Sequence, residues 1–283
     1  MSTTERGPFA QAQRLRAIIH RSRGSNHGAI TRLMSPGDLG QVLKPFVFLD
    51  AFDNGGKPFP TFGMHPHSGL ATLTYVLEGS VSYRDTNAAS GFLREGGIEW
   101  MRAGRGAWHS GGAGDPGVTR GFQLWVALPP NLELGPSLSI YKSAHEIGEA
   151  GPARVLLGEH EGVQGPFAAP ASMNYLAVSL RAGQRWRYEP PANHSILWLA
   201  TAKGSIRTLE AVQPGEIVVF EYGDRAVDIV ASEDAEFVIG SAVPHPHDLV
   251  LGYYSVHTSE GALAAGETHI RQLREALVAS GRF

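Results

Sequence analysis

Three histidines in two glycine-rich segments are the residues best suited to chemistry in this sequence. His65 and His67 lie between Thr61 and Gly69, and His109 lies between Ala103 and Gly111. Neutral imidazole is a strong ligand for iron, copper, nickel and zinc. Residues i and i+2 of a strand point to one face, so His65 and His67 can face a single metal ion. His109, on a strand that folds back, can supply a third ligand.

The spacing alone leaves a second interpretation open, in which Pro66 fixes a turn and the histidines are ordinary polar loop residues. The chain contains no cysteine, which excludes a zinc-finger site and a cysteine nucleophile. His245 and His247 repeat the His-Pro-His pattern without a following strand, so we interpret them as loop. His194 has no neighbouring histidine at ligand spacing.

The segments around the histidines are predicted to be strands. Leu70–Leu77 is apolar, β-branched or aromatic on both faces, as expected for a buried strand. Further short strands are expected at Val81–Asp85, Ile98–Met101, Phe122–Val126, Asn174–Leu180, Ser195–Ala200, Ile217–Phe220, Val227–Val230 and Phe237–Ile239. Their close spacing and a weak internal repeat favour two barrels or sandwiches. The segment Glu267–Val278 has an apolar stripe at helical spacing and is predicted to be a helix that packs on a barrel wall.

Composition narrows the class of protein. The chain has 283 residues, 18% of them charged, a net charge of −3, and many glycines (35) and prolines (18). This balance suits strands joined by tight turns and gives no reason to expect direct binding of nucleic acid. Met1–Ala10 lacks the apolar core of a signal peptide, and no apolar run reaches the length of a membrane span. We therefore expect a cytoplasmic protein without membrane attachment, in which Arg14, Arg16, Arg21 and Arg23 form a solvated arm.

Several long segments resemble the pirin family of the cupin superfamily. These segments are Phe46–Phe52, His65–Gly69, Thr74–Gly79, Arg84–Asp85, Glu99–Ser110 and Gln123–Pro129, with a weaker continuation through Gly252–Val256 and the final helix. The resemblance implies an all-β fold of two cupin-type β-barrels (a bicupin) with a C-terminal helix. It places the metal-binding barrel in residues 1–135, and a metal-free barrel with the helix in residues 136–283.

The resemblance also implies three histidines and one glutamate as metal ligands. His65, His67 and His109 match the histidines, whereas Gly111 stands at the position of the glutamate. We therefore expect one divalent metal ion, iron first, with manganese, nickel, copper or zinc as alternatives, held less tightly than by a complete ligand set. Asp115, in the loop that follows His109, is a candidate replacement acid. Glu99 could face either side of its strand.

Two functions follow from this resemblance. The first is a quercetinase-type dioxygenase, with a small aromatic, flavonol-type substrate. The alternative is a non-catalytic regulatory protein that binds a protein partner and has a weakened or lost metal site. The retained histidines favour the enzyme, and the missing glutamate favours the alternative.

Overall fold

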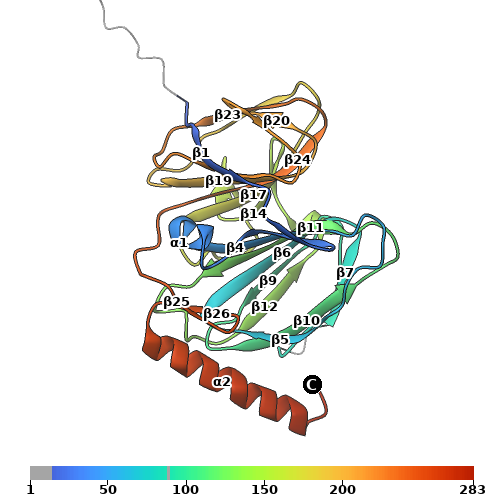
Figure 1. Ribbon diagram of the computed structural model, residues 1–283, viewed down its shortest axis with the longest axis vertical. Helices are drawn as coiled ribbons and strands as arrows, with labels where there is room; N and C mark the ends of the chain where they lie inside the picture. The colour runs from blue at the N-terminus through green and yellow to red at the C-terminus, as the bar shows by residue number, and fades with distance from the viewer. Residues whose placement is uncertain (1–14, 88–89) are drawn as a thin grey trace, which may run out of the picture.

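A computed structural model describes residues 15–87 and 90–283 of the chain. Two β-barrels are stacked along the long axis of the molecule, with the long C-terminal helix below the lower one (Figure 1). Each barrel consists of a seven-stranded and a four-stranded antiparallel sheet. This confirms the predicted all-β fold with a C-terminal helix. Residues 1–14 lie outside the described residues. They include Arg14 and the segment Met1–Ala10, for which we expect no signal peptide.

The N-terminal barrel contains the strands that carry the three histidines. Its larger sheet has the order β12-β9-β6-β11-β4-β3-β2, and its smaller sheet has the order β5-β10-β7-β8. The strands are β2 (Ser25–His27), β3 (Ile30–Met34), β4 (Phe46–Asp53), β5 (Phe62–His67), β6 (Leu70–Glu78), β7 (Ser80–Asp85), β8 (Ser90–Arg94), β9 (Ile98–Arg102), β10 (Ala107–Ala113), β11 (Arg120–Ala127) and β12 (Leu138–Lys142).

The C-terminal barrel repeats this arrangement. Its larger sheet has the order β1-β22-β19-β24-β17-β14-β13, and its smaller sheet has the order β18-β23-β20-β21. The strands are β1 (Ile18–Ser22), β13 (Glu149–Ala150), β14 (Ala153–Leu157), β17 (Met173–Leu180), β18 (Arg185–Tyr188), β19 (Ile196–Lys203), β20 (Ile206–Arg207), β21 (Ala211–Val212), β22 (Ile217–Phe220), β23 (Val227–Ala231) and β24 (Ala235–Ala242).

A few short elements and the final helix complete the described chain. They are α1 (Leu39–Leu43), the 3-10 turn η1 (Ala144–Glu146), the hairpins β15 (Glu159–His160) with β16 (Val163–Gln164) and β25 (Val250–Gly252) with β26 (Ser255–His257), and α2 (Glu260–Ala279). The predicted helix is correct but longer, because the Ser259 hydroxyl accepts a hydrogen bond from the Ala262 amide and caps an earlier first turn. Among the described helices, none has both the length and the apolarity to cross a membrane. The cytoplasmic location stays a prediction.

The apolar cores explain where the molecule has room for a site. The two larger sheets share one core between them, to which Phe46, Leu73, Tyr175 and Trp198 belong. A second apolar cluster belongs to both sheets of the C-terminal barrel, with Leu176 and Phe237 among its members. No comparable apolar cluster covers the inner face of the N-terminal barrel in the described residues. That barrel therefore has an interior available to polar side chains and ligands.

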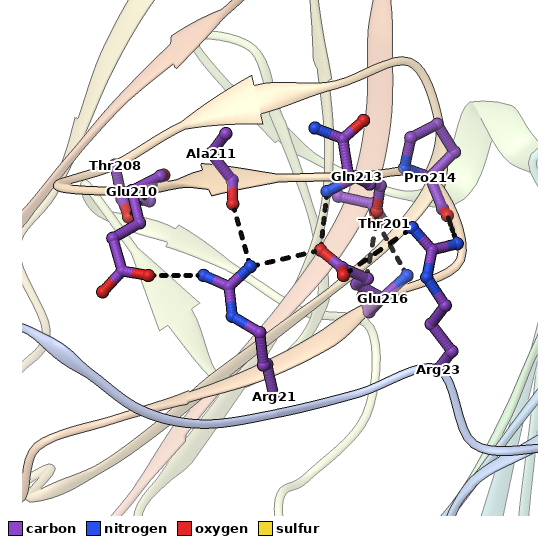
Figure 2. A network of polar contacts seen from close by, with 9 residues as sticks. All are labelled: Arg21, Arg23, Thr201, Thr208, Glu210, Ala211, Gln213, Pro214 and Glu216. Atoms are coloured by element: carbon purple, nitrogen blue, oxygen red, sulfur yellow. Dashed lines mark hydrogen bonds and ion pairs between the residues drawn. The ribbon is translucent and has the colours of Figure 1, made fainter.

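Three segments pack across the predicted division at residue 135. The early strand β1 pairs with β22. Figure 2 shows Arg21 of β1 and Arg23, just after it, directed at Glu216; the nitrogen-oxygen distances are 3.8 and 3.7 Å. In the other direction, β12 pairs with β9 of the N-terminal barrel, and α2 contacts β10. The division into residues 1–135 and 136–283 stays a prediction.

Candidate metal centre and cavity

The fold brings the three predicted histidines together. His65 and His67 lie two residues apart on β5 and therefore share a face, and the antiparallel partner β10 places His109 directly opposite His65. One ring nitrogen from each of the three histidines lies within 4.8 Å of the others. The closest pair is Nε2 of His67 and Nε2 of His109, at 3.1 Å. In the part of the chain that the structure describes, this is the group of side chains with the geometry to hold a metal ion.

Hydrogen bonds at the outer nitrogens define which ring atoms face inward. Nδ1 of His65 lies 2.8 Å from the Gly63 carbonyl oxygen, and Nδ1 of His67 lies 3.1 Å from the Tyr254 carbonyl oxygen. A carbonyl oxygen only accepts, so both Nδ1 atoms carry hydrogen and both Nε2 atoms present lone pairs. Such lone pairs repel one another unless a proton or a metal cation lies between them. The donor set therefore fits a divalent transition metal.

Burial keeps the imidazoles of His65 and His67 neutral. It lowers the pKa of His65 to about 4, with His109 nearby contributing in the same direction. Burial and then the two neighbouring imidazoles lower the pKa of His67 well below its ordinary value. His67 is completely buried and lies edge-on to Trp125, with the ring centroids 4.7 Å apart. Both residues are thus in the protonation state that binds metal at neutral pH.

Glycines in the two predicted segments permit the tight turns beside the ligands. Gly69 has φ +74°, and a side chain there would meet the Val256 carbonyl oxygen at 2.0 Å. Gly104 also has a positive φ, and its carbonyl accepts a hydrogen bond from the Gly69 amide. A Cβ at Gly106 would lie 2.6 Å from the Ile270 side chain of α2. These glycines are therefore required by the backbone conformation and by close packing, as their positions in tight turns indicate.

The C-terminal segment contributes to the site, which the sequence pattern did not predict. The turn between β25 and β26 places the Tyr254 carbonyl against His67, and Ser68 forms a bridge with Ser255. The Ser68 hydroxyl lies 3.0 Å from Nε2 of His257, whose Nδ1 lies 3.1 Å from Glu133 Oε2. Residues at the end of the chain thus fix the orientation of a candidate ligand.

A cavity of about 520 Å³ opens beside the histidines. Ligand sites typically have volumes of ~300–1,000 Å³. His65 and His109 line one wall of the cavity, and many of its other walls are aromatic. Its aromatic lining consists of Phe48, Phe52, Phe59, Phe62, Tyr83, Trp125 and Tyr254. Gly111 also lines the cavity, so the missing glutamate would have pointed into this space.

In the structure, the acid that lies beside the histidines is Glu99 and not the candidate Asp115. Asp115 is more than half exposed, pairs with Arg94 and Ser80, and does not line the cavity. Glu99 does line it, and its Oε1 lies 3.9 Å from Nδ1 of His109. The prediction for Asp115 is therefore wrong, because its loop folds back over β7 and β8 rather than over the histidines. The sequence signal that could have identified Glu99 is its acidic side chain among the apolar residues of β9.

Hydrogen bonds hold Glu99 in place. It is 5% exposed, and it accepts hydrogen bonds from the Thr74 hydroxyl at 2.8 Å and the Tyr141 hydroxyl at 3.3 Å. Burial alone would raise the pKa of Glu99, but His109, Thr74 and Tyr141 together outweigh it and lower that pKa below its ordinary value. A buried carboxylate thus lies beside the histidines without being one of the three grouped donors.

Other histidines have different surroundings. His194 lies between the hydroxyls of Ser172 and Ser241, at 2.9 and 2.8 Å. Nδ1 of His245 lies near the backbone of His247, as in a turn. Neither belongs to a group of metal-ligand geometry among the described residues. A metal-free C-terminal barrel stays a prediction.

Comparisons with known proteins agree with this architecture. The Pirin family model matches residues 28–126. A pirin-like protein of Caulobacter vibrioides is 32% identical over 247 residues, which cover 83% of this chain and 89% of that protein. The matched region of the family model includes all three histidines.

Solved structures show the same fold. A quercetin 2,3-dioxygenase from Acinetobacter baumannii superposes with a TM-score of 0.83 at 21% identity, covering 92% of this chain and 98% of that chain. A bacterial pirin from Escherichia coli in complex with nickel(II) superposes with a TM-score of 0.63 at 19% identity, covering 82% of this chain and 99% of that chain.

Proposed function

Because this chain belongs to the pirin family, we propose that its N-terminal barrel is a metal-dependent dioxygenase site for flavonol-type aromatic substrates such as quercetin. The observation that supports this most strongly is the group of three close imidazoles, two of which, His65 and His109, line a cavity with aromatic sides. An ion held there would be reachable by a flat ligand. The solved structures of this fold include a quercetin 2,3-dioxygenase and a nickel-bound pirin.

The residues of the site have separate tasks in this proposal. His65, His67 and His109 would hold one divalent metal ion, with iron as the first candidate and manganese, nickel, copper or zinc as alternatives. The bound metal would act as a Lewis acid that brings the substrate oxygens and dioxygen together. Three neutral ligands leave further coordination positions open toward the cavity. Trp125 packs edge-on to His67 and would exclude water from that side of its ring.

A second candidate function rests on Gly111. Without a carboxylate ligand the site has no anionic donor, so it should hold a divalent metal less tightly than a site with three histidines and one glutamate. A protein with a largely empty site would keep the fold and could act by binding a protein partner. This is the alternative that the experiment must separate from the enzyme.

Metal analysis and oxygen uptake test the two functions together. Elemental analysis compares the wild type, His109→Ala, and His20→Ala, whose histidine is exposed on β1 and serves as the matched control. We expect near-stoichiometric metal in the wild type and the control, loss of metal in His109→Ala, and oxygen uptake with quercetin that follows the metal. Metal without oxygen uptake favours the regulatory function. No metal after incubation with iron, manganese, nickel and copper overturns the proposed enzyme.

A further inference from the structure

A row of polar side chains crosses the larger sheet of the N-terminal barrel at a single register. Residues opposite each other on antiparallel strands have side chains on the same face. Successive pairings connect six strands in this way, from β12 through β9, β6, β11 and β4 to β3. The row consists of Tyr141, Glu99, Thr74, Gln123, Asp50 and Arg32.

Five members of this row, from Glu99 to Arg32, line the cavity beside the histidines. The C-terminal barrel has an equivalent row on its larger sheet, which consists of Val155, Leu176, Ile239, Leu199 and Val218. All members of that second row are buried in an apolar core. The same fold thus packs hydrocarbon at this register in one barrel and places hydrogen-bonding groups in the other. Burying polar groups is unfavourable unless they have partners, so the polar row requires water or a ligand beside it.

Most members of the row already have protein partners. Arg32 pairs with Asp50, and the Thr74 hydroxyl donates to Glu99. Gln123 lies between these two pairs and is half-buried. Among the described residues, its amide has no hydrogen-bonding side chain or backbone group as a partner, although it faces the cavity. It therefore has two N–H donors and one carbonyl acceptor available to a ligand.

Aromatic rings flank the row on both sides. Phe48 lies two residues before Asp50, and Trp125 lies two residues after Gln123, so both rings are on the same face of the sheet as the row. The two rings are stacked, with their centroids 4.0 Å apart and an interplanar angle of 8°. Phe52 stands two residues from Asp50 in the other direction and also lines the cavity. This arrangement suits a flat ring system whose edge groups meet the polar row.

We infer that this row is the substrate-recognition floor of the cavity and that Gln123 determines specificity by hydrogen bonding to the hydroxyl or carbonyl oxygens of a planar polyphenol. The inference rests on the proposed function and specifies its substrate. Gln123 lies two strands from Glu99, about 10 Å at normal strand spacing. A ligand of several linked rings can therefore reach the histidines with one end and Gln123 with another. Simple phenols are too short to use both.

Binding of two flavonols to nickel-loaded protein without oxygen tests the inference. Quercetin has hydroxyls on both ring systems, whereas 3-hydroxyflavone keeps the two oxygens suited to a metal and lacks the other hydroxyls. Calorimetry gives the affinity of each for the wild type, for Gln123→Met, and for Gln164→Met, an exposed control in the hairpin of β15 and β16. Methionine keeps the length of glutamine and removes its hydrogen-bonding groups.

We expect the wild type to prefer quercetin. Gln123→Met should bind quercetin about fivefold to tenfold more weakly, as for the loss of one or two hydrogen bonds, and 3-hydroxyflavone within about twofold of the wild type. An unchanged preference in Gln123→Met overturns the inference and leaves the proposed function intact. The expected preference without oxygen uptake on aeration of either the nickel-loaded or the iron-loaded protein supports the inference and overturns the enzyme. Failure of the wild type to bind either flavonol overturns both.

Discussion

Glu99 and His109 face each other across 3.9 Å, with the carboxylate oxygen Oε1 opposite the ring nitrogen Nδ1. The other nitrogen of His109 points toward His67. The 3.9 Å distance between Glu99 and His109 is longer than a hydrogen bond, so the carboxylate acts on the imidazole electrostatically and can increase its basicity from outside the ligand set. The site lacks the glutamate ligand of its family, but Glu99 places a carboxylate next to it. That carboxylate faces Nδ1 of His109, on the side of the ring away from His67.

The first prediction concerns the contribution of Glu99 to metal binding. Glu99→Gln keeps the size and the hydrogen bond from Thr74 but removes the negative charge, so the affinity for nickel(II) should fall about 10- to 100-fold. Calorimetric titration of metal-free protein measures this. Glu95→Gln, an exposed glutamate before the same strand, is the control. An unchanged affinity in Glu99→Gln would mean that the carboxylate does not act on His109.

The second prediction restores the missing ligand. Gly111 lines the cavity and shares a face of β10 with His109. A Cβ there would have one close neighbour, the Ser82 carbonyl oxygen at 3.3 Å, so a small shift accommodates it. Gly111→Glu should bind iron(II) or nickel(II) at least about tenfold more tightly, because an anionic oxygen joins three neutral nitrogens. Gly111→Gln has the same shape without the charge, and an equal gain in both variants would contradict a ligand role.

The sequence predicts the strands, the C-terminal helix and the convergence of His65, His67 and His109, because alternation along a strand and turn glycines are local signals. It does not predict the partners of these histidines. Glu99 could face either side of β9 until the sheet register is known, and Tyr254 reaches His67 from almost 190 residues away. Asp115 is near His109 in the sequence, but its contacts with Arg94 and Ser80 hold it away from the histidines. Long-range pairing decides which polar groups share a cavity.

The third prediction concerns the connection between the C-terminal segment and the histidines. Glu133 is 3% exposed and accepts hydrogen bonds from the Thr258 amide at 2.8 Å and the Thr258 hydroxyl at 2.6 Å, beside His257. In Glu133→Gln an amide N–H group faces these donors. The free energy of unfolding should therefore fall by about 1–3 kcal/mol. Metal affinity should fall with it, because this segment carries the Tyr254 carbonyl that orients His67.

Urea denaturation and hydrogen exchange of β25 and β26 measure this connection. Glu275→Gln, an exposed residue of α2, is the control. Faster exchange in this hairpin with unchanged metal affinity would show that the segment is structural and has no influence on the histidines.

The fourth prediction concerns the pH dependence of stability in the metal-free protein. Burial lowers the pKa of His194 to about 4, while its hydroxyl partners Ser172 and Ser241 fill the surrounding space. In the unfolded chain the pKa of a histidine is about 6.5. Between these values the unfolded chain binds more protons, so this contribution to stability is complete above about pH 6.5 and decreases as the pH falls toward 4. At pH 5 the loss attributable to His194 is about 2 kcal/mol. His194→Gln, compared with His20→Gln by urea denaturation at pH 5 and 7.5, should lose less stability on acidification than the wild type. An identical loss in both variants would show that other groups account for the acid sensitivity.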